Sequence, residues 1–490
     1  MPTVEGFATR PPISGKDKPF PYNVGMRALL VSTYDLGRQP FGLASPAAWL
    51  KEAGVEVDCL DTSREDPDDA RIAAASLVAF YLPMHTATRL AAPLIDRVRR
   101  VNPSARLCAY GLYAPLNEGW LRARGIRDVL GPEAEADLVA IAKAQIPDGK
   151  SQSPKPKAQI PTAMPRLRFI QPDRSLLLPL EKYASLTMPD GSRRIVGSTD
   201  ATRGCKHLCR HCPIVPVYKG QFRVVPVDVV LSDIRAQVAQ GAEHITFGDP
   251  DFFNGPTHAR RIIESLARDY PGLTYDVTIK VEHLLAHAEL LPLLQATGCL
   301  FVTSAVESID DSVLDKLLKG HTRADFVRAV GLCRDAGLTL IPTFVAFHPW
   351  TTPQSYVELL DLLEELDLVE RVAPIQLAIR LLITAESPLR ELDDIRAAIG
   401  PFDAGSLTYP WTHPDPRVDA LQQEVMRSVG ATMHGPRTQA FHALARIAQE
   451  AAGVLPAKAG SHTWLPPSGG SRVPTISEPW YCCAEPLETF

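Results

Sequence analysis

Short apolar runs alternate with amphipathic stretches over the first part of the chain. The runs are rich in aliphatic and aromatic residues, and the stretches between them repeat apolar residues at helical spacing. The predicted strands are Arg27–Thr33, Val55–Leu60, Leu77–Leu82, Arg106–Tyr110 and Arg127–Leu130, with helical stretches at 46–53 and near 86–101, 116–124 and 133–145. Strands that alternate with helices predict a parallel sheet with helices on both faces, so residues 26–146 are expected to form one α/β domain.

This domain is Rossmann-like in its alternation, but its first strand is not followed by a GxGxxG turn. Dinucleotide binding therefore has no support. Residues 1–25 are expected to be an irregular lead and residues 147–193 a linker, whose first part is rich in proline, lysine and serine.

A second alternation begins near residue 194 and is longer. The predicted strands are Ile195–Ser198, His244–Phe247, Leu273–Ile279, Leu300–Ser304, Leu338–Phe347 and Ile375–Ile383. The helical stretches are 228–239, 258–269, 287–296, 311–318, 324–336 and 353–365. The pattern predicts a partial parallel (β/α)6 barrel over 194–395, with its chemistry at the carboxyl ends of the strands. A helical region over 396–454 and a proline- and glycine-rich tail over 455–490 complete an α/β chain.

Charge and apolar patterning exclude some classes of function. The chain has 490 residues and a net charge of −5, so no overall basic field favours nucleic acid or an anionic membrane surface. Its longest apolar runs are too short to span a bilayer, and no signal peptide is recognised, so a cytoplasmic protein is expected. Nine cysteines, an odd number, do not indicate a disulfide framework.

Three of these cysteines form a CxxxCxxC motif, Cys205, Cys209 and Cys212, directly after the first predicted barrel strand. Chance would produce roughly 0.003 such spacings in a chain of this composition. A structural zinc ion would need a fourth ligand, for which His207 or His211 is available. An iron–sulfur cubane held by three cysteines instead leaves one iron open for a substrate or cofactor.

The motif and its place resemble the radical S-adenosylmethionine (SAM) enzymes, and the resemblance covers residues 194 to about 390. It implies that the three cysteines hold a [4Fe–4S] cluster whose open iron binds SAM, and that one electron cleaves a carbon–sulfur bond of SAM. It also implies an external one-electron reductant such as flavodoxin or ferredoxin. His211, before the third cysteine, takes the place that lies near the adenine in the family.

Other positions match this family less closely. The turn after the second barrel strand, with Gly248, Asp249 and Asp251, takes the place of the segment that binds the methionyl amine. Asp-Pro-Asp is also a good turn former in its own right. Ser304 and Glu307 are candidates for the ribose hydroxyls, and Lys280 for the SAM carboxylate or the substrate. Arg380 is a candidate partner of a carboxylate or a salt-bridged surface residue.

The first domain has the position and pattern of a cobalamin-binding domain. It lacks the DxHxxG loop that supplies a histidine to cobalt, and His85 has no such context. Cobalamin is therefore not expected as a cofactor, and its binding would have to do without that histidine. A scaffold that has lost its ligand is the other interpretation.

The tail ends in Cys482-Cys483-Ala-Glu-Pro, which resembles the CUAEP/CCAEP-tail radical SAM proteins. The resemblance extends to arsinothricin biosynthesis and implies transfer of the 3-amino-3-carboxypropyl group of SAM to thiol-bound trivalent arsenic, a thiophilic substrate. Cys482 and Cys483 would then be catalytic. The pair is also suited to disulfide exchange, selenium or another metal. The alternative functions are 5′-deoxyadenosyl radical chemistry, cobalamin-dependent methyl transfer and a zinc-stabilised binding protein.

Overall fold

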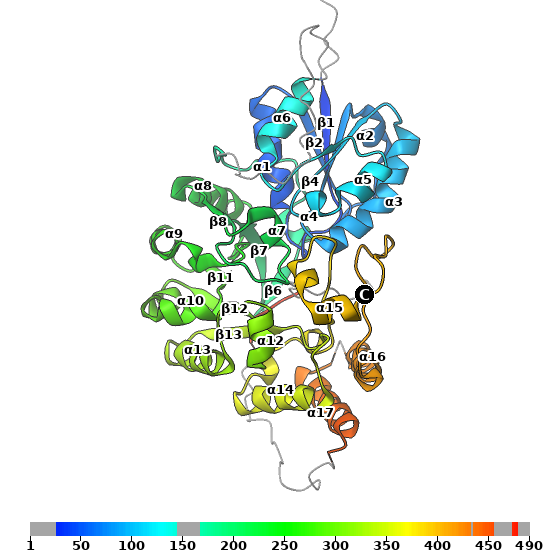
Figure 1. Cartoon of the computed structure of the whole chain (residues 1–490). Coiled ribbons are helices and arrows are strands. Elements are labelled where there is room, and N and C mark those ends of the chain that lie inside the picture. Colours follow the sequence, from blue (N-terminus) through cyan, green and yellow to red (C-terminus); the bar gives the residue numbers. More distant parts are fainter. Residues whose placement is uncertain (1–25, 145–166, 433–434, 455–472, 479–490) are drawn as a thin grey trace, which may run out of the picture.

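A computed structural model describes residues 26–144, 167–432, 435–454 and 473–478. Two α/β parts lie one above the other, with the first part at the top in blue and cyan and the second below it in green and yellow (Figure 1). Within the described residues, no helix has both the length and the apolar character that crossing a membrane requires.

The first part is a parallel sheet of five strands in the order β2-β1-β3-β4-β5. The strands are β1 (Arg27–Ser32), β2 (Glu56–Asp61), β3 (Leu77–Tyr81), β4 (Arg106–Tyr110) and β5 (Asp128–Val129). Helices α1 (Phe41–Glu52), α2 (Asp69–Ala74), α3 (His85–Val101), α4 (Tyr113–Leu116), α5 (Glu118–Ala123) and α6 (Glu135–Lys143) cover it. Alternate residues of β1 enter two separate cores, Leu29 one and Leu30 the other, because successive side chains of a strand point to opposite faces.

The second part is an open, curled sheet in the order β13-β12-β11-β10-β7-β6-β14. Its parallel strands are β7 (Arg193–Thr199), β10 (His244–Phe247), β11 (Thr274–Thr278), β12 (Cys299–Glu307) and β13 (Thr339–Phe344). The short strands β6 (Ser185–Thr187) and β14 (Thr475–Ile476) extend one edge in antiparallel pairing. A separate hairpin joins β8 (Thr202–Gly204) to β9 (Phe222–Val224) and carries α7 (Ile214–Tyr218).

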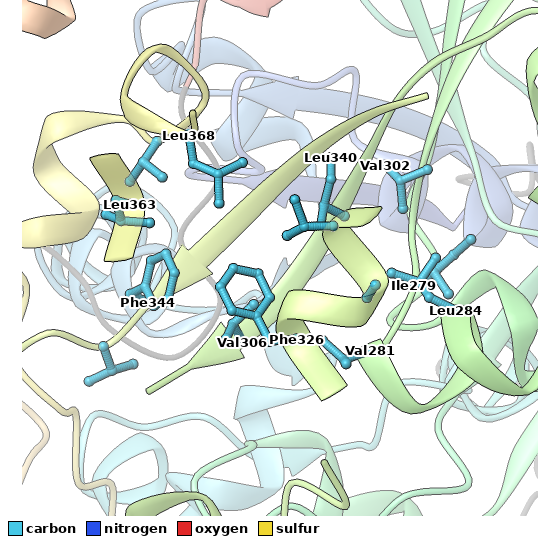
Figure 2. Packing of buried hydrophobic residues seen from close by; sticks show 14 of the residues in the cluster. Ile279, Val281, Leu284, Val302, Val306, Phe326, Leu340, Phe344, Leu363 and Leu368 are labelled. Atoms are coloured by element: carbon cyan, nitrogen blue, oxygen red, sulfur yellow. The ribbon is translucent and has the colours of Figure 1, made fainter. Parts of the chain in front are cut away.

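Helices cover the outer face of this sheet. Their apolar side chains and those of the strands form the main core. They are α8 (Val227–Val238), α9 (Pro256–Asp269), α10 (Val281–Ala286), α11 (Leu291–Ala296), α12 (Asp311–Lys316), α13 (Arg323–Asp335) and α14 (Pro353–Glu365). Figure 2 shows Phe326 of α13 and Leu284 of α10 packed against Val302, Leu340 and Phe344 of the sheet. Helices α15 (Asp393–Ala398), α16 (Pro416–Thr432) and α17 (Arg437–Ala452) follow, and α17 packs on α14 and α16.

Two predictions from the sequence are wrong. The expected sixth strand at 375–383 is a 3₁₀ turn, Pro374–Leu377, followed by a single bridge between Phe347 and Arg380. The apolar run fills the core there without a ladder. The expected single helix at 287–296 is instead a 3₁₀ turn, Ala288–Leu290, followed by α11, which begins at Leu291 with Pro292 in its first turn.

Candidate active site

The carboxyl ends of the parallel strands in both sheets face one cavity of about 310 Å³. From the first sheet, the loops after β1 and β3 contribute Arg38 and Met84, and Tyr81 at the end of β3 also lines the cavity. These loops flank the point where the strand order reverses, which is where open α/β sheets bind ligands. From the second part, the cavity is lined by Cys205, Cys209, Cys212, His211, Gly248, Asp249, Lys280, Glu307 and Lys319.

The loop that carries the three cysteines begins at the end of β8. Gly204, the residue before Cys205, has a φ of +79°, and a Cβ there would lie 2.3 Å from Tyr218 and 2.6 Å from the Gln221 carbonyl. Only glycine fits this position without rearrangement. Farther along the loop, the Arg210 amide donates to the Leu317 carbonyl at 3.0 Å, which fixes the loop to the segment after α12.

The cysteines are buried or half-buried, and none is in a disulfide. Burial raises the pKa of the Cys205 thiol to about 12, and it also raises the pKa of Cys209, although Lys319 and Lys280 oppose that rise. Buried thiols at such positions ionise readily only beside a positive charge such as a bound metal. The donor set therefore fits an iron–sulfur cluster better than three free thiols.

Both histidines of the loop have partners other than the cysteines. His211 Nε2 lies 3.2 Å from Glu307 Oε1, and His207 lies 3.5 Å from both Asp251 and Glu282. These contacts weaken the case for either histidine as the fourth ligand of a zinc site.

Glu307 is the centre of a fully buried group at the end of β12. Its carboxylate lies 3.5 Å from Lys319 Nζ as well as beside His211. Burial opposes ionisation, but Lys319 and His211 outweigh it and lower the pKa of Glu307 to about 2. Burial in turn lowers the pKa of His211. Glu307 thus brings a fixed negative charge to the cavity wall.

Residues 200–363 match the family model described as Radical SAM superfamily. The chain carries a radical SAM domain. The curated relatives that match this radical SAM domain are enzymes by name, and the domain marks the chain as a radical SAM enzyme. Such a domain implies a [4Fe–4S] cluster and SAM, and the three cysteines with their cavity fit both.

Two relatives illustrate the likeness in sequence. A tRNA-2-methylthio-N(6)-dimethylallyladenosine synthase of Symbiobacterium thermophilum is 26% identical over 184 residues, which are 33% of this chain and 37% of that protein. A bacteriochlorophyllide d C-12(1)-methyltransferase of Chlorobaculum tepidum is 28% identical over 133 residues, 26% of this chain and 28% of that protein. The match thus spans well under half the length of these relatives.

Solved structures share the fold over most of the radical SAM chain. The radical SAM methyltransferase TsrM of Kitasatospora setae, bound to tryptophan and a SAM analogue, has a TM-score of 0.55 at 21% identity and covers 70% of this chain and 72% of that chain. The cobalamin-dependent radical enzyme OxsB, bound to aqua-cobalamin and SAM, has a TM-score of 0.65 at 14% identity, covering 87% and 71%. The aqua-cobalamin in OxsB leans against our expectation that cobalamin is not a cofactor of this chain.

The turn after β10 has two carboxylates with different surroundings. Asp249 lines the cavity and accepts hydrogen bonds from the Ala201 amide at 2.9 Å and the Thr202 hydroxyl at 2.5 Å. Burial, aided by the nearby charge of Asp200, raises the pKa of Asp249 to about 7. Asp251 instead points to His207 and His283. The structure therefore brings Asp249, but not Asp251, to the SAM cavity.

The remaining predicted residues are also divided. Lys280 lines the cavity, with Nζ 3.3 Å from Glu282. The Ser304 hydroxyl is buried in β12, and no protein group among the described residues hydrogen-bonds it. Arg380 pairs with Asp419 at 2.8 Å and stacks on Trp411, as a salt-bridged residue does. Cys482 and Cys483 lie outside the described residues.

Sequence reasoning missed the residues that the first domain contributes. Arg38 lines the radical SAM cavity, and its neighbour Gly37 contacts the tail through Glu478. The only sequence signal is that Arg38 follows a strand of a parallel sheet. That signal has meaning only once the two sheets are known to face each other.

Proposed function

We propose that this radical SAM enzyme transfers the 3-amino-3-carboxypropyl group of SAM to trivalent arsenic held by Cys482 and Cys483. The cluster, when present, supplies the electron that starts cleavage of SAM. In the net reaction the lone pair of arsenic becomes the new As–C bond. The electron pair of the broken C–S bond stays on the sulfur of methylthioadenosine, and the starting electron is recovered when arsenic reaches the pentavalent state.

One observation carries the proposal: the described end of the tail, which lines a second pocket, is bound beside residues of the first domain that also line the cavity of the cysteines. Ile476 of β14 pairs with Leu186 of β6, and the Ser477 amide donates to the Ser185 carbonyl at 2.9 Å. Two residues of the first domain then hold Glu478, which forms an ion pair with Arg64 at 3.2 Å and packs against Gly37.

The chain between Glu478 and Cys482 is short. Leu36 and Arg38, which flank Gly37, both line the cavity that the cysteines share. Cys482 follows Glu478 by four residues, a length of chain that spans at most about 14 Å when extended. Tethering at that point would hold a thiol-bound substrate near the reaction site at a high effective concentration.

Charged residues of the cavity suit the aminocarboxypropyl group. Lys280 and Arg38 offer positive charge for its carboxylate, and Glu307 offers negative charge for its ammonium. Charge-assisted hydrogen bonds of this kind are about twice as strong as neutral ones and orient both ends of the group. Glu307 is suited to this role because its low pKa keeps it ionised.

The coproduct of SAM tests the proposal. Anaerobically reconstituted full-length protein is incubated with SAM, dithionite and arsenite, and the products are separated by mass-detected chromatography. We expect methylthioadenosine and an arsenic species that contains the aminocarboxypropyl group. 5′-Deoxyadenosine as the sole coproduct would contradict the proposal.

A matched pair of variants separates the tail from the cluster. Cys482→Ser with Cys483→Ser is expected to lower arsenic product at least tenfold while the iron content stays unchanged. Cys333→Ala removes a buried core thiol of α13 and is expected to keep the product. Equal product formation by all three proteins would exclude arsenic binding by the tail.

A second candidate is cobalamin-dependent methyl transfer. It is favoured by the cavity's position at the β1/β3 reversal of the first sheet and by the fold shared with cobalamin-bound OxsB. Against it, a cavity of about 310 Å³ lies at the lower limit for a drug-sized ligand, and a corrinoid is much larger. Hydroxocobalamin retained after gel filtration, with SAM-derived methyl transfer, would favour this candidate.

A further inference from the structure

Two histidines and an aspartate meet beside the cluster loop but outside the SAM cavity. His207 comes from the loop itself, Asp251 from the turn after β10, and His283 from α10. One ligand atom from each side chain lies within 4.8 Å of the others. None of the three is among the described residues that line the cavity.

The possible ligand atoms of this group lie close to one another. Asp251 Oδ2 and His283 Nδ1 are 2.6 Å apart, yet both atoms are buried and make no hydrogen bond to a described residue. The Nε2 atoms of His207 and His283 face each other at 3.3 Å. A cation between the carboxylate and the two imidazoles would give the buried Asp251 Oδ2 and His283 Nδ1 a partner that no described residue supplies.

The charge state of the group also suits a cation. Asp251 is fully buried, and its carboxylate lies 3.5 Å from His207 and 2.6 Å from His283. Glu282 adds a second carboxylate, 3.5 Å from His207 Nδ1. A carboxylate behind a ligating imidazole is the usual means of orienting a histidine on a metal. Lys280, 3.3 Å from Glu282, offsets part of this charge.

We propose that His207, Asp251 and His283 bind a divalent first-row transition-metal ion such as Zn²⁺. Two imidazoles and one carboxylate are a common ligand set for Zn²⁺ and Fe²⁺. The ion would join the cluster loop to the end of β10 and to α10, and so hold His207 in place between Cys205 and Cys209. This site is separate from the cluster cysteines, and it does not depend on the proposed transfer to arsenic.

Metal retention tests the site without SAM turnover. The anaerobically reconstituted full-length protein, with its cluster oxidised, is dialysed against Zn²⁺ and then against metal-free buffer, and zinc and iron are measured by mass spectrometry. We expect one zinc per chain in addition to the cluster iron. Asp251→Asn and His283→Gln should each weaken zinc binding at least tenfold and keep the iron.

The matched control is His287→Gln. His287 lies one helical turn beyond His283, with ring centroids 5.8 Å apart, but belongs to no metal-ligating group among the described residues. Equal zinc retention in the wild type, Asp251→Asn and His283→Gln would overturn the proposal, as would a wild type that retains no zinc.

Cobalt provides a readout that does not require a variant to fold. Co²⁺ bound to the wild type should give the spectrum of nitrogen and oxygen ligation, without sulfur-to-cobalt charge transfer. A charge-transfer band would assign the bound ion to the cysteines and overturn the proposal. Neither result depends on which SAM coproduct is formed.

Discussion

The two sheets of this protein obey the same rule of architecture but bring different chemistry to the cavity they share. The first part contributes mainly apolar and aromatic groups, such as Tyr81, Tyr110 and Tyr113, and three charged residues, Asp35, Arg38 and Glu135. The second contributes cysteines and the charged residues Lys280, Glu307 and Lys319. Strand direction thus locates a site, whereas side-chain composition shows which half carries the reaction.

This difference also assigns roles. In the proposed function the second part would hold the cluster and the charged ends of SAM, and the first part would close the cavity. The first part also receives the tail at Gly37. The parts are joined by buried ion pairs, among them Arg203 on β8 with Glu135 on α6 at 2.7 Å. Matched substitutions in the two parts test these roles.

The largest difference is expected between two cysteine substitutions, one in each part. Cys209→Ala should abolish the cluster and reduce SAM cleavage by about a thousandfold or more, because the reaction loses its electron source. Cys108→Ala, a buried thiol on β4 of the first sheet, should keep both. Visible absorption, iron content and SAM coproduct formation measure the two. A cluster-free Cys108→Ala protein with native circular dichroism would contradict the assignment of roles.

The next effect concerns the link between the parts. Arg203→Met leaves Glu135 buried without its main partner and should lower the free energy of unfolding by about 3–5 kcal/mol. Arg97→Met, which removes an ion pair to Asp69 on the surface, should change it far less, because solvent screens exposed ion pairs. Urea denaturation measures both. Similar losses of unfolding free energy in the two variants would show that the buried pair stabilises the protein no more than the exposed pair does.

Asp249 predicts a dependence of stability on pH. Its pKa is about 7 in the folded protein and ordinarily 3.8, so the folded state holds a proton that the unfolded chain releases between these values. Stability should therefore fall as pH rises from about 4 to 7, by a few kcal/mol at most, and then level off. Asp249→Asn should flatten this slope. A slope equal to that of the wild type in urea titrations at pH 5 and 7.5 would contradict the prediction.

The smallest effect is expected at the anchor of the tail. Arg64→Ala removes a partly exposed ion pair to Glu478 and should reduce formation of the arsenic product by no more than about fivefold, at unchanged SAM cleavage without arsenite. Lys51→Ala, which removes the exposed pair with Asp173, serves as the control. If Arg64→Ala abolished SAM cleavage itself, Arg64 would have a role beyond the tail.

Strands and helices with a strong local pattern were predicted closely. The strands His244–Phe247 and Arg106–Tyr110 and the helix Pro353–Glu365 have the predicted bounds. The helix begins with Thr352, whose side chain and that of Ser355 form a capping box. The run at 375–383 failed because an apolar segment also fills a core without a ladder. β14 was missed because a two-residue strand exists only through its pairing with β6.

The sequence by itself determined the cysteine motif, the two α/β alternations and the edges at which chemistry should lie. These depend on local spacing, which needs no knowledge of distant residues. Only the tertiary structure decided that Glu307 lies between His211 and Lys319, that Asp249 and Asp251 serve different sites, and that Glu478 meets Gly37. Those contacts join residues far apart in the chain, and their geometry and burial are set by packing.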